Sequence, residues 1–101
     1  MAEEISITQL DPLLEHRLRL GACVLLSDTD RCSFSRLKEL LGGTDGNLGA
    51  QLRKLEDSNY VSVEKTFQGR RPISWYQLTP LGRKALKAHL KALQNLISYG
   101  K

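Results

Sequence analysis

Two adjacent arginines, Arg70 and Arg71, lie between two runs of β-prone residues and have no acidic residue beside them. A guanidinium group carries a permanent charge and presents a fork of donors that matches phosphate oxygens. Gly69 permits a tight turn before the pair, and Pro72 after it fits an edge position. The pair therefore indicates a hairpin tip that binds a polyanion. The alternative is a charged pair that keeps the hairpin soluble and protects its edge.

The charge of the whole chain points the same way. The formal net charge is +4, and residues 79–101 hold five bases and no acid, whereas residues 1–30 are acidic. A basic surface of this kind fits a nucleic acid as partner. A solvated lysine face is the alternative interpretation.

Composition excludes several other classes of protein. A length of 101 residues predicts a single domain over residues 1–101. No run of 18 apolar residues is present and the first ten residues lack an apolar signal core, so a cytoplasmic protein without a membrane partner is expected. The two cysteines, Cys23 and Cys32, are expected to be reduced thiols, with a redox pair as the alternative.

Catalytic and cofactor-binding patterns are missing from the sequence. His16 and His89 are isolated, and no GxGxxG, P-loop, nucleophile elbow or metal-ligand spacing occurs. We therefore expect neither an enzyme nor a cofactor.

The elements that position the arginines follow from capping and periodicity. Asp11 and Thr79, each followed by proline, begin the first and last helices, and Ser35 and Thr44 cap the two helices between them. The glycine pair at Gly42 ends the second helix, and alternation predicts the hairpin. The expected elements are a lead over 1–10, helices over 12–27, 35–41, 44–58 and 80–98, and a hairpin over 61–78.

This order of elements satisfies the helix-turn-helix pattern followed by a hairpin, or wing. The stretches TDGNLGAQLRKLE, NYVSVEK, FQGRRP and YQLTPLGRKAL, in this order, resemble small bacterial and archaeal winged-helix transcriptional regulators of the MarR, PadR and ArsR groups. The resemblance covers about residues 12–97 and implies a winged helix-turn-helix, which is an α+β fold that is mainly α. Gly49 and Gln51 stand where relatives often have serine and histidine, which leaves the base preference open.

The third helix carries the candidate base contacts. Leu48, Leu52 and Leu55 form its core face, so its polar and small residues face outward, where asparagine or glutamine could pair with adenine. Asn59, directly after this helix, is expected in a left-handed conformation. The expected DNA-binding residues are Arg36, Lys38, Thr44, Asn47, Ala50, Gln51, Arg53, Lys54, Lys65, Gln68, Arg70 and Arg71.

The last helix carries two apolar stripes, of which one can pack on the first helix. The other needs a partner, which predicts a two-fold homodimer. The expected dimer interface consists of Leu14, Leu18, Leu86, Leu90, Leu93 and Ile97.

The sequence thus predicts a homodimeric regulator that binds a palindromic operator in double-stranded DNA. The third helix would enter the major groove, and the wing would reach the minor groove or its phosphates. A small-molecule effector is not identified by any motif. The alternative is a winged helix that binds another protein and no DNA.

Overall fold

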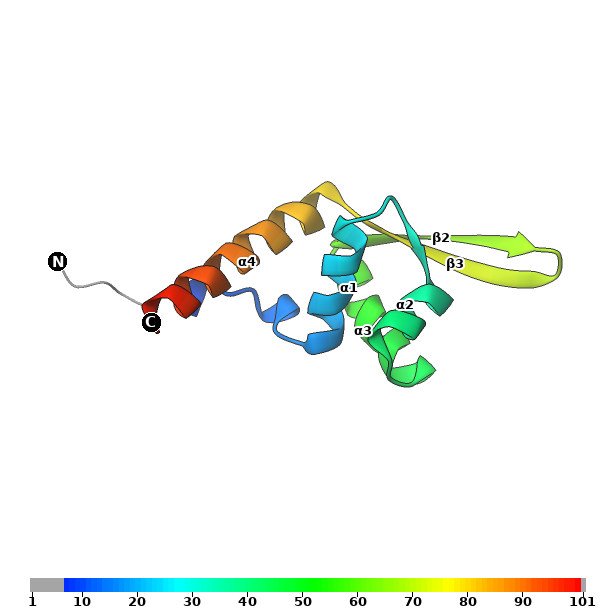
Figure 1. Ribbon diagram of the computed structural model, residues 1–101. Helices are drawn as coiled ribbons and strands as arrows, with labels where there is room; N and C mark the ends of the chain where they lie inside the picture. Colours follow the sequence, from blue (N-terminus) through cyan, green and yellow to red (C-terminus); the bar gives the residue numbers. More distant parts are fainter. Residues whose placement is uncertain (1–6, 101) are drawn as a thin grey trace.

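The computed structural model describes residues 7–100. The wing and the last helix extend in opposite directions from a cluster of three short helices (Figure 1), and the longest dimension is 63 Å. The predicted winged helix-turn-helix, mainly α, is confirmed. The elements are η1 (Ile7–Gln9), η2 (Pro12–Leu14), α1 (Arg17–Ser27), β1 (Cys32–Ser33), α2 (Phe34–Leu41), α3 (Asp45–Asp57), β2 (Val61–Gln68), β3 (Arg71–Leu78) and α4 (Pro80–Tyr99).

The core lies where α1, α2 and α3 meet the base of the wing. Leu26 of α1, Leu37 of α2 and Leu48 of α3 are fully buried, and Leu78 at the end of β3 closes the same cluster. Buried residues recur at helical spacing within α1 (Leu18, Ala22 and Leu26) and within α3 (Leu48, Leu52 and Leu55), so these helices bury one face and leave the other free. The outer face of α3 is therefore available to a partner.

The first predicted helix, 12–27, is wrong at its start. Asp11 caps only the 3-10 turn η2, and α1 begins at Arg17, after His16, whose side chain caps it by accepting from the Leu18 N–H at 3.1 Å. The reason is tertiary: the Asp11 N–H donates to His89 Nδ1 at 2.9 Å, which holds the entry segment against α4. The predicted lead over 1–10 can be compared only from residue 7 onward, because residues 1–6 lie outside the described residues.

The second predicted helix, 35–41, begins one residue earlier, because Ser33 rather than Ser35 is its cap. The Ser33 hydroxyl accepts from the Arg36 N–H at 3.1 Å. Ser33 also pairs with Trp75, and Cys32 with Tyr76, so β1 adds a strand to the sheet, which has the order β1-β3-β2. The sequence predicted only the two strands of the hairpin, so β1 is an additional strand.

The predictions for α3 and its exit are confirmed. Thr44 caps the helix by accepting from the Asn47 N–H at 3.1 Å. Asn59 has φ 62°, the left-handed conformation expected of it. The chain then turns directly into β2, so Thr44 fixes where α3 starts, and Asn59 marks where it stops and the wing begins.

The wing is a regular antiparallel hairpin whose side chains alternate between two faces. Val61 pairs with Leu78, Val63 with Tyr76, and the register runs without a break to Gln68 opposite Arg71. Because successive side chains of a strand point to opposite faces, the residues in phase with Val61 share the face that meets α3. This face, called the inner face of the wing below, carries Val61, Val63, Lys65 and Phe67 from β2 and Pro72, Ser74, Tyr76 and Leu78 from β3.

The last helix buries one side and leaves a second apolar stripe exposed. Leu86 is buried within the chain's own fold, as are Leu14 and Leu18, so the expected placement of these three residues in a dimer interface is wrong. Apolar periodicity marks faces but does not say which face the chain itself covers. The stripe that stays accessible, called the α4 stripe below, consists of Leu90, Leu93 and Ile97.

Within residues 7–100, no helix has both the length and the apolar character needed to cross a membrane.

Candidate nucleic-acid interface

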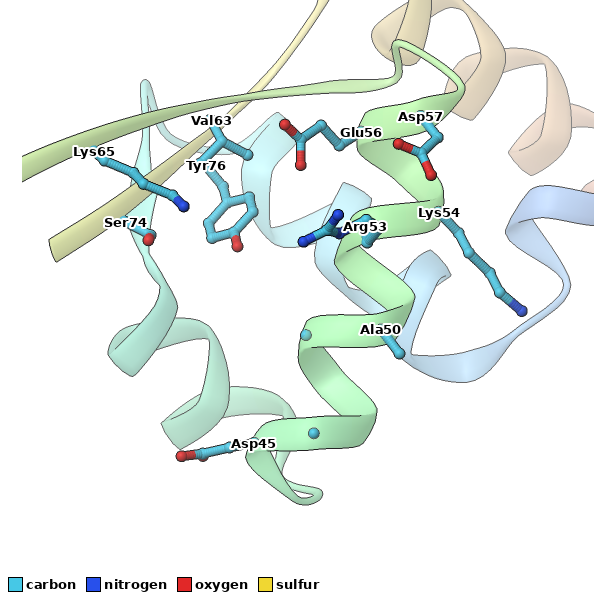
Figure 2. Close-up of a pocket in the computed structure, with 12 residues that line it drawn as sticks. Asp45, Ala50, Arg53, Lys54, Glu56, Asp57, Val63, Lys65, Ser74 and Tyr76 are labelled. Atoms are coloured by element: carbon cyan, nitrogen blue, oxygen red, sulfur yellow. The ribbon is translucent and has the colours of Figure 1, made fainter. Parts of the chain in front are cut away.

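A groove of about 950 Å³ separates the outer face of α3 from the inner face of the wing. Figure 2 shows side chains reaching into it from both elements. Lys65 and Tyr76 line its wing side, and Arg53 lines its helix side. Two elements that the sequence predicted separately therefore form one concave surface.

The α3 side of the groove is made of small residues. Gly46, Gly49 and Ala50 line it. A Cβ built at Gly46 would meet no atom within 4 Å, and one at Gly49 would only reach the Phe34 ring at 4.0 Å. Packing within the chain therefore does not require these glycines, although each costs a helix up to about 1 kcal/mol relative to alanine. Small residues here leave room for another backbone to approach the helix.

Arg53, Lys54 and Lys65 supply the positive charge of the groove. All three are exposed, and within residues 7–100 none of them has an ion-pair partner. Asp45, Glu56 and Asp57 also line this groove, at the two ends of α3. Arg53 and Lys54 therefore lie in the C-terminal half of the helix, close in sequence to Glu56 and Asp57, and Lys65 lies across the groove on the wing.

Two further residues that were expected to contact phosphates, Arg36 and Lys38, already pair with carboxylates that partly neutralise their charge. Lys38 Nζ lies 2.5 Å from Asp45 Oδ1, and Arg36 Nη1 lies 3.7 Å from Glu39 Oε1. Both pairs are at the surface, where an ion pair contributes little stability and exchanges readily with another anion. Arg36 and Lys38 would thus have to exchange a carboxylate for a phosphate.

Tyr76 offers a neutral donor on the wing side of the groove. Burial raises the pKa of its phenol, the Glu56 carboxylate raises this pKa further, and the Arg53 guanidinium opposes both effects. The hydroxyl consequently keeps its proton at neutral pH. It can donate a hydrogen bond to an anion lying in the groove.

Gln51, expected to face DNA, is buried instead. Its Oε1 accepts a hydrogen bond from Nη1 of Arg19 in α1, and its Nε2 donates to Oδ1 of Asn47 at 3.2 Å. Arg19 is itself fixed, because its Nε donates to the Leu13 carbonyl at 2.6 Å. The structure therefore makes Gln51 a support for the exposed Asn47, whose two amide N–H groups donate to no other group within residues 7–100.

Arg19 was missed by the sequence analysis. It lies in the apolar helix α1 between Leu18 and Leu20. A charged residue inside an apolar stripe requires a polar partner, and Gln51 at the edge of the core face of α3 could have been matched to it. That pairing is the signal that periodicity alone did not provide.

The wing tip carries Arg70 and Arg71, both exposed. Gly69 has φ 66°, a conformation that favours glycine and closes the turn. Arg71 follows the alternation of β3 onto the face opposite the groove, and Arg70 lies in the turn between the strands. The tip therefore carries two exposed cations.

Trp75 stiffens the hairpin on that opposite face. Its Nε1 donates to Thr66 Oγ1 across the hairpin at 3.1 Å, and the Arg31 guanidinium lies 4.2 Å from its ring centroid. Arg31 also contacts Glu64 at 3.5 Å. These contacts link β3 to β2 and to the loop before β1, which limits the directions in which the wing can swing.

Thr44 and Gln68 do not line the groove, and alternation along β2 places Gln68 on the face opposite it. Thr44 and Gln68 are exposed. The Thr44 hydroxyl oxygen already accepts from the Asn47 N–H, but its proton remains available to a phosphate oxygen. Ala50, Arg53 and Lys54 lie on the exposed face of α3, as expected.

The cysteines and histidines lie away from this groove. Cys23 and Cys32 are free, buried thiols, as expected, and burial raises the pKa of Cys23 to about 12. His16 and His89 accept hydrogen bonds from backbone N–H groups. In residues 7–100, no three metal-ligating side chains come together.

Comparisons with known proteins agree with this geometry. The model of the winged helix DNA-binding domain family matches residues 18–97. An uncharacterized protein of Methanocaldococcus jannaschii is 34% identical over 79 residues, which make up 78% of this chain and 86% of that protein.

Solved structures show the same arrangement. A transcriptional regulator homologue from Pyrococcus horikoshii is 29% identical and superposes with a TM-score of 0.78 over 85% of each chain. A protein from Enterococcus faecalis, described as belonging to the MarR family of transcriptional regulators, is 26% identical, with a TM-score of 0.66 over 87% of this chain and 76% of that one. The resemblance to winged-helix regulators that the sequence indicated is thereby confirmed.

Proposed function

The chain belongs to the winged helix DNA-binding domain family, and from this premise we propose that it is a homodimeric transcriptional regulator that binds a palindromic operator. In this proposal α3 enters the major groove and the wing lies along the neighbouring minor groove or its phosphates. As a regulator of transcription it would act in a prokaryotic cytoplasm, associated with the nucleoid when bound.

One observation carries the proposal: the groove-lining face of α3 combines glycines that packing does not require with cations that have no ion-pair partner within residues 7–100. Gly46 and Gly49 let the helix backbone approach a duplex closely, and Arg53 and Lys54 lie one to two turns further along the same helix. Asn47, supported from behind by Gln51, is placed to donate from its amide to a base edge.

The α4 stripe supports the dimer. Leu90 is 42% exposed and Ile97 is 55% exposed, at helical spacing on the part of α4 that extends away from the wing (Figure 1). A second copy related by a two-fold axis would cover this stripe with the same stripe of its partner. Such a dimer predicts half-sites about one helical turn, or 10 base pairs, apart.

Replacing Arg70 and Arg71 with alanine is expected to lower the affinity for the operator and to flatten its dependence on salt. Each phosphate contact contributes about 0.9 to the slope of log K against log salt, so the slope should fall by about one to two units per protomer. Fluorescence anisotropy across a salt series measures it. Replacing Lys84 and Lys87, two exposed lysines of α4, is the matched control. An unchanged slope for the arginine variant would contradict a wing contact.

Replacing Asn47 with alanine is expected to change which base is preferred at one position of each half-site. A side-chain amide that donates to a base edge distinguishes bases by about 1–3 kcal/mol, or roughly 5- to 150-fold. Selection of duplexes from a random pool, with wild type and variant in parallel, measures the preference. An equal loss of affinity for all sequences would instead assign Asn47 to the sugar-phosphate backbone.

A winged helix that binds another protein is the second candidate function, and the acids in the groove favour it. Asp45, Glu56 and Asp57 line the same surface as the cations, and a mixed surface of this kind suits a protein partner. Retention of random duplex in a gel shift at low salt distinguishes the two functions, because the protein-binding function predicts that no duplex is retained.

A further inference from the structure

The wing tip carries an exposed apolar pair that the contacts described above leave unused. Phe67 is 73% exposed, more than any other large hydrophobic residue of the described chain. Its register partner across the hairpin is Pro72, which is also exposed. An aromatic ring held this far from the core contributes little to folding, because most of its surface stays in water.

The pair lies on the inner face of the wing. Alternation along β2 places Phe67 in phase with Val63 and Lys65, and alternation along β3 places Pro72 in phase with Ser74. Lys65 and Ser74 line the groove. Phe67 is two residues beyond Lys65, about 7 Å further out at the rise of a strand. A duplex that occupied the groove would therefore meet this ring where it passes the wing tip.

The surroundings of the ring are cationic. Lys65 shares its face, Arg70 and Arg71 lie within four residues of it along the chain, and residues 65–71 contain no acid. An apolar contact with a second copy of the same tip would bring six cations together, which Coulomb repulsion disfavours. A partner that is negatively charged outside and apolar inside accommodates both the ring and the charges. A DNA duplex has this composition, because phosphates enclose its stacked bases.

We propose that Phe67, supported by Pro72, inserts as an apolar wedge into the minor groove of the bound duplex and bends it. The inference deepens the proposed function and rests on it. Apolar side chains that enter a minor groove partly unstack one base step and kink the duplex away from the protein by roughly 20–90°. Pyrimidine–purine steps unstack most easily, so the wedge favours such a step beneath the wing. The arginines beside it hold the flanking phosphates.

Replacing Phe67 with alanine tests the wedge on the duplex that the wild-type protein selects from a random pool. We expect about tenfold weaker binding, a smaller bend, a weaker preference for a pyrimidine–purine step and an unchanged salt slope, because no charge is removed. Energy transfer between dyes at the two duplex ends measures the bend, and anisotropy measures the affinity. Phe67→Leu should retain most of the bend, because leucine also serves as a wedge.

Two controls make the result specific. Val24→Ala removes an apolar side chain that is 42% exposed on α1, away from the groove, and should change neither bend nor affinity. Thermal unfolding of each variant shows whether the fold is intact. Wild-type bending and affinity in Phe67→Ala would overturn the wedge, as would a loss of affinity with the bend unchanged. Failure of the wild-type protein to retain any duplex would instead refute the proposed function.

Discussion

The double substitution Leu90→Glu and Ile97→Glu is expected to yield monomers and to weaken operator binding at least a hundredfold. Both side chains belong to the α4 stripe and are substantially exposed in the protomer, so glutamate there does not disturb its own core. In a two-fold interface the substitutions would bury four carboxylates without partners, which is prohibitively costly. A monomer also loses the second half-site, and joining two sites typically raises affinity 10²- to 10⁴-fold.

Light scattering measures the oligomeric state, and anisotropy on the selected duplex measures the affinity. The matched control is Val24→Glu with Leu81→Glu, which introduces the same charge at side chains that are 42% and 51% exposed but lie outside the α4 stripe. The control separates the general effect of added negative charge on DNA binding from the loss of the dimer. A dimer that persists in the double variant, or a wild-type protein that is monomeric at micromolar concentration, would contradict the assigned interface.

The parts of the fold that were predicted from the sequence depend on local chemistry. Thr44 caps α3, Asn59 adopts the left-handed conformation, and Gly69 closes the wing turn. Each of these signals acts within four residues of the backbone that it shapes, so no knowledge of the rest of the chain is needed. This is why α3 and the wing, which form the groove, were found from the sequence.

The errors arise where distant residues decide the conformation. The first helix is interrupted because Asp11 is held by His89, 78 positions away, and by the Tyr60 hydroxyl, which donates to its Oδ2 at 2.5 Å. Burial and this hydrogen bond raise the pKa of Tyr60 to about 12, so the donor persists at physiological pH. Gln51 is likewise turned inward by Arg19, 32 positions away. Local patterns contain no information about such pairings.

In the candidate site, too, features set by local sequence were predicted, and features set by distant residues were not. Periodicity placed Arg53 and Lys54 on the outer face of α3, where the structure has them. It could not show that Lys38 is paired with Asp45, nor that Phe67 is exposed on the inner face of the wing. Whether a surface cation is free, and which of two faces a strand side chain joins, depends on the three-dimensional neighbours.

The backbone of α4 packs closely against the base of the wing at Gly82. Among the glycines of the described residues, Gly82 leaves the least space for a Cβ. The carbonyl of Tyr60, at the base of the wing, accepts hydrogen bonds from the Thr79 N–H at 3.0 Å and the Thr79 hydroxyl at 3.1 Å. Thr79 also caps α4 by accepting from the Gly82 N–H at 2.9 Å. A Cβ at Gly82 would lie 2.1 Å from that same carbonyl oxygen and 2.9 Å from Leu78 Cδ1.

Replacing Gly82 with alanine is therefore expected to lower the free energy of unfolding by about 3 kcal/mol or more, a large part of the roughly 5–15 kcal/mol of a small domain. The clash is with backbone, so no side-chain rotation relieves it, and α4 must shift away from the wing. Urea unfolding followed by circular dichroism measures the loss. Gly46→Ala is the matched control, because a Cβ there meets no atom within 4 Å. It should raise stability by up to about 1 kcal/mol through helix propensity. Equal stability of the two variants would contradict the close contact between α4 and Tyr60.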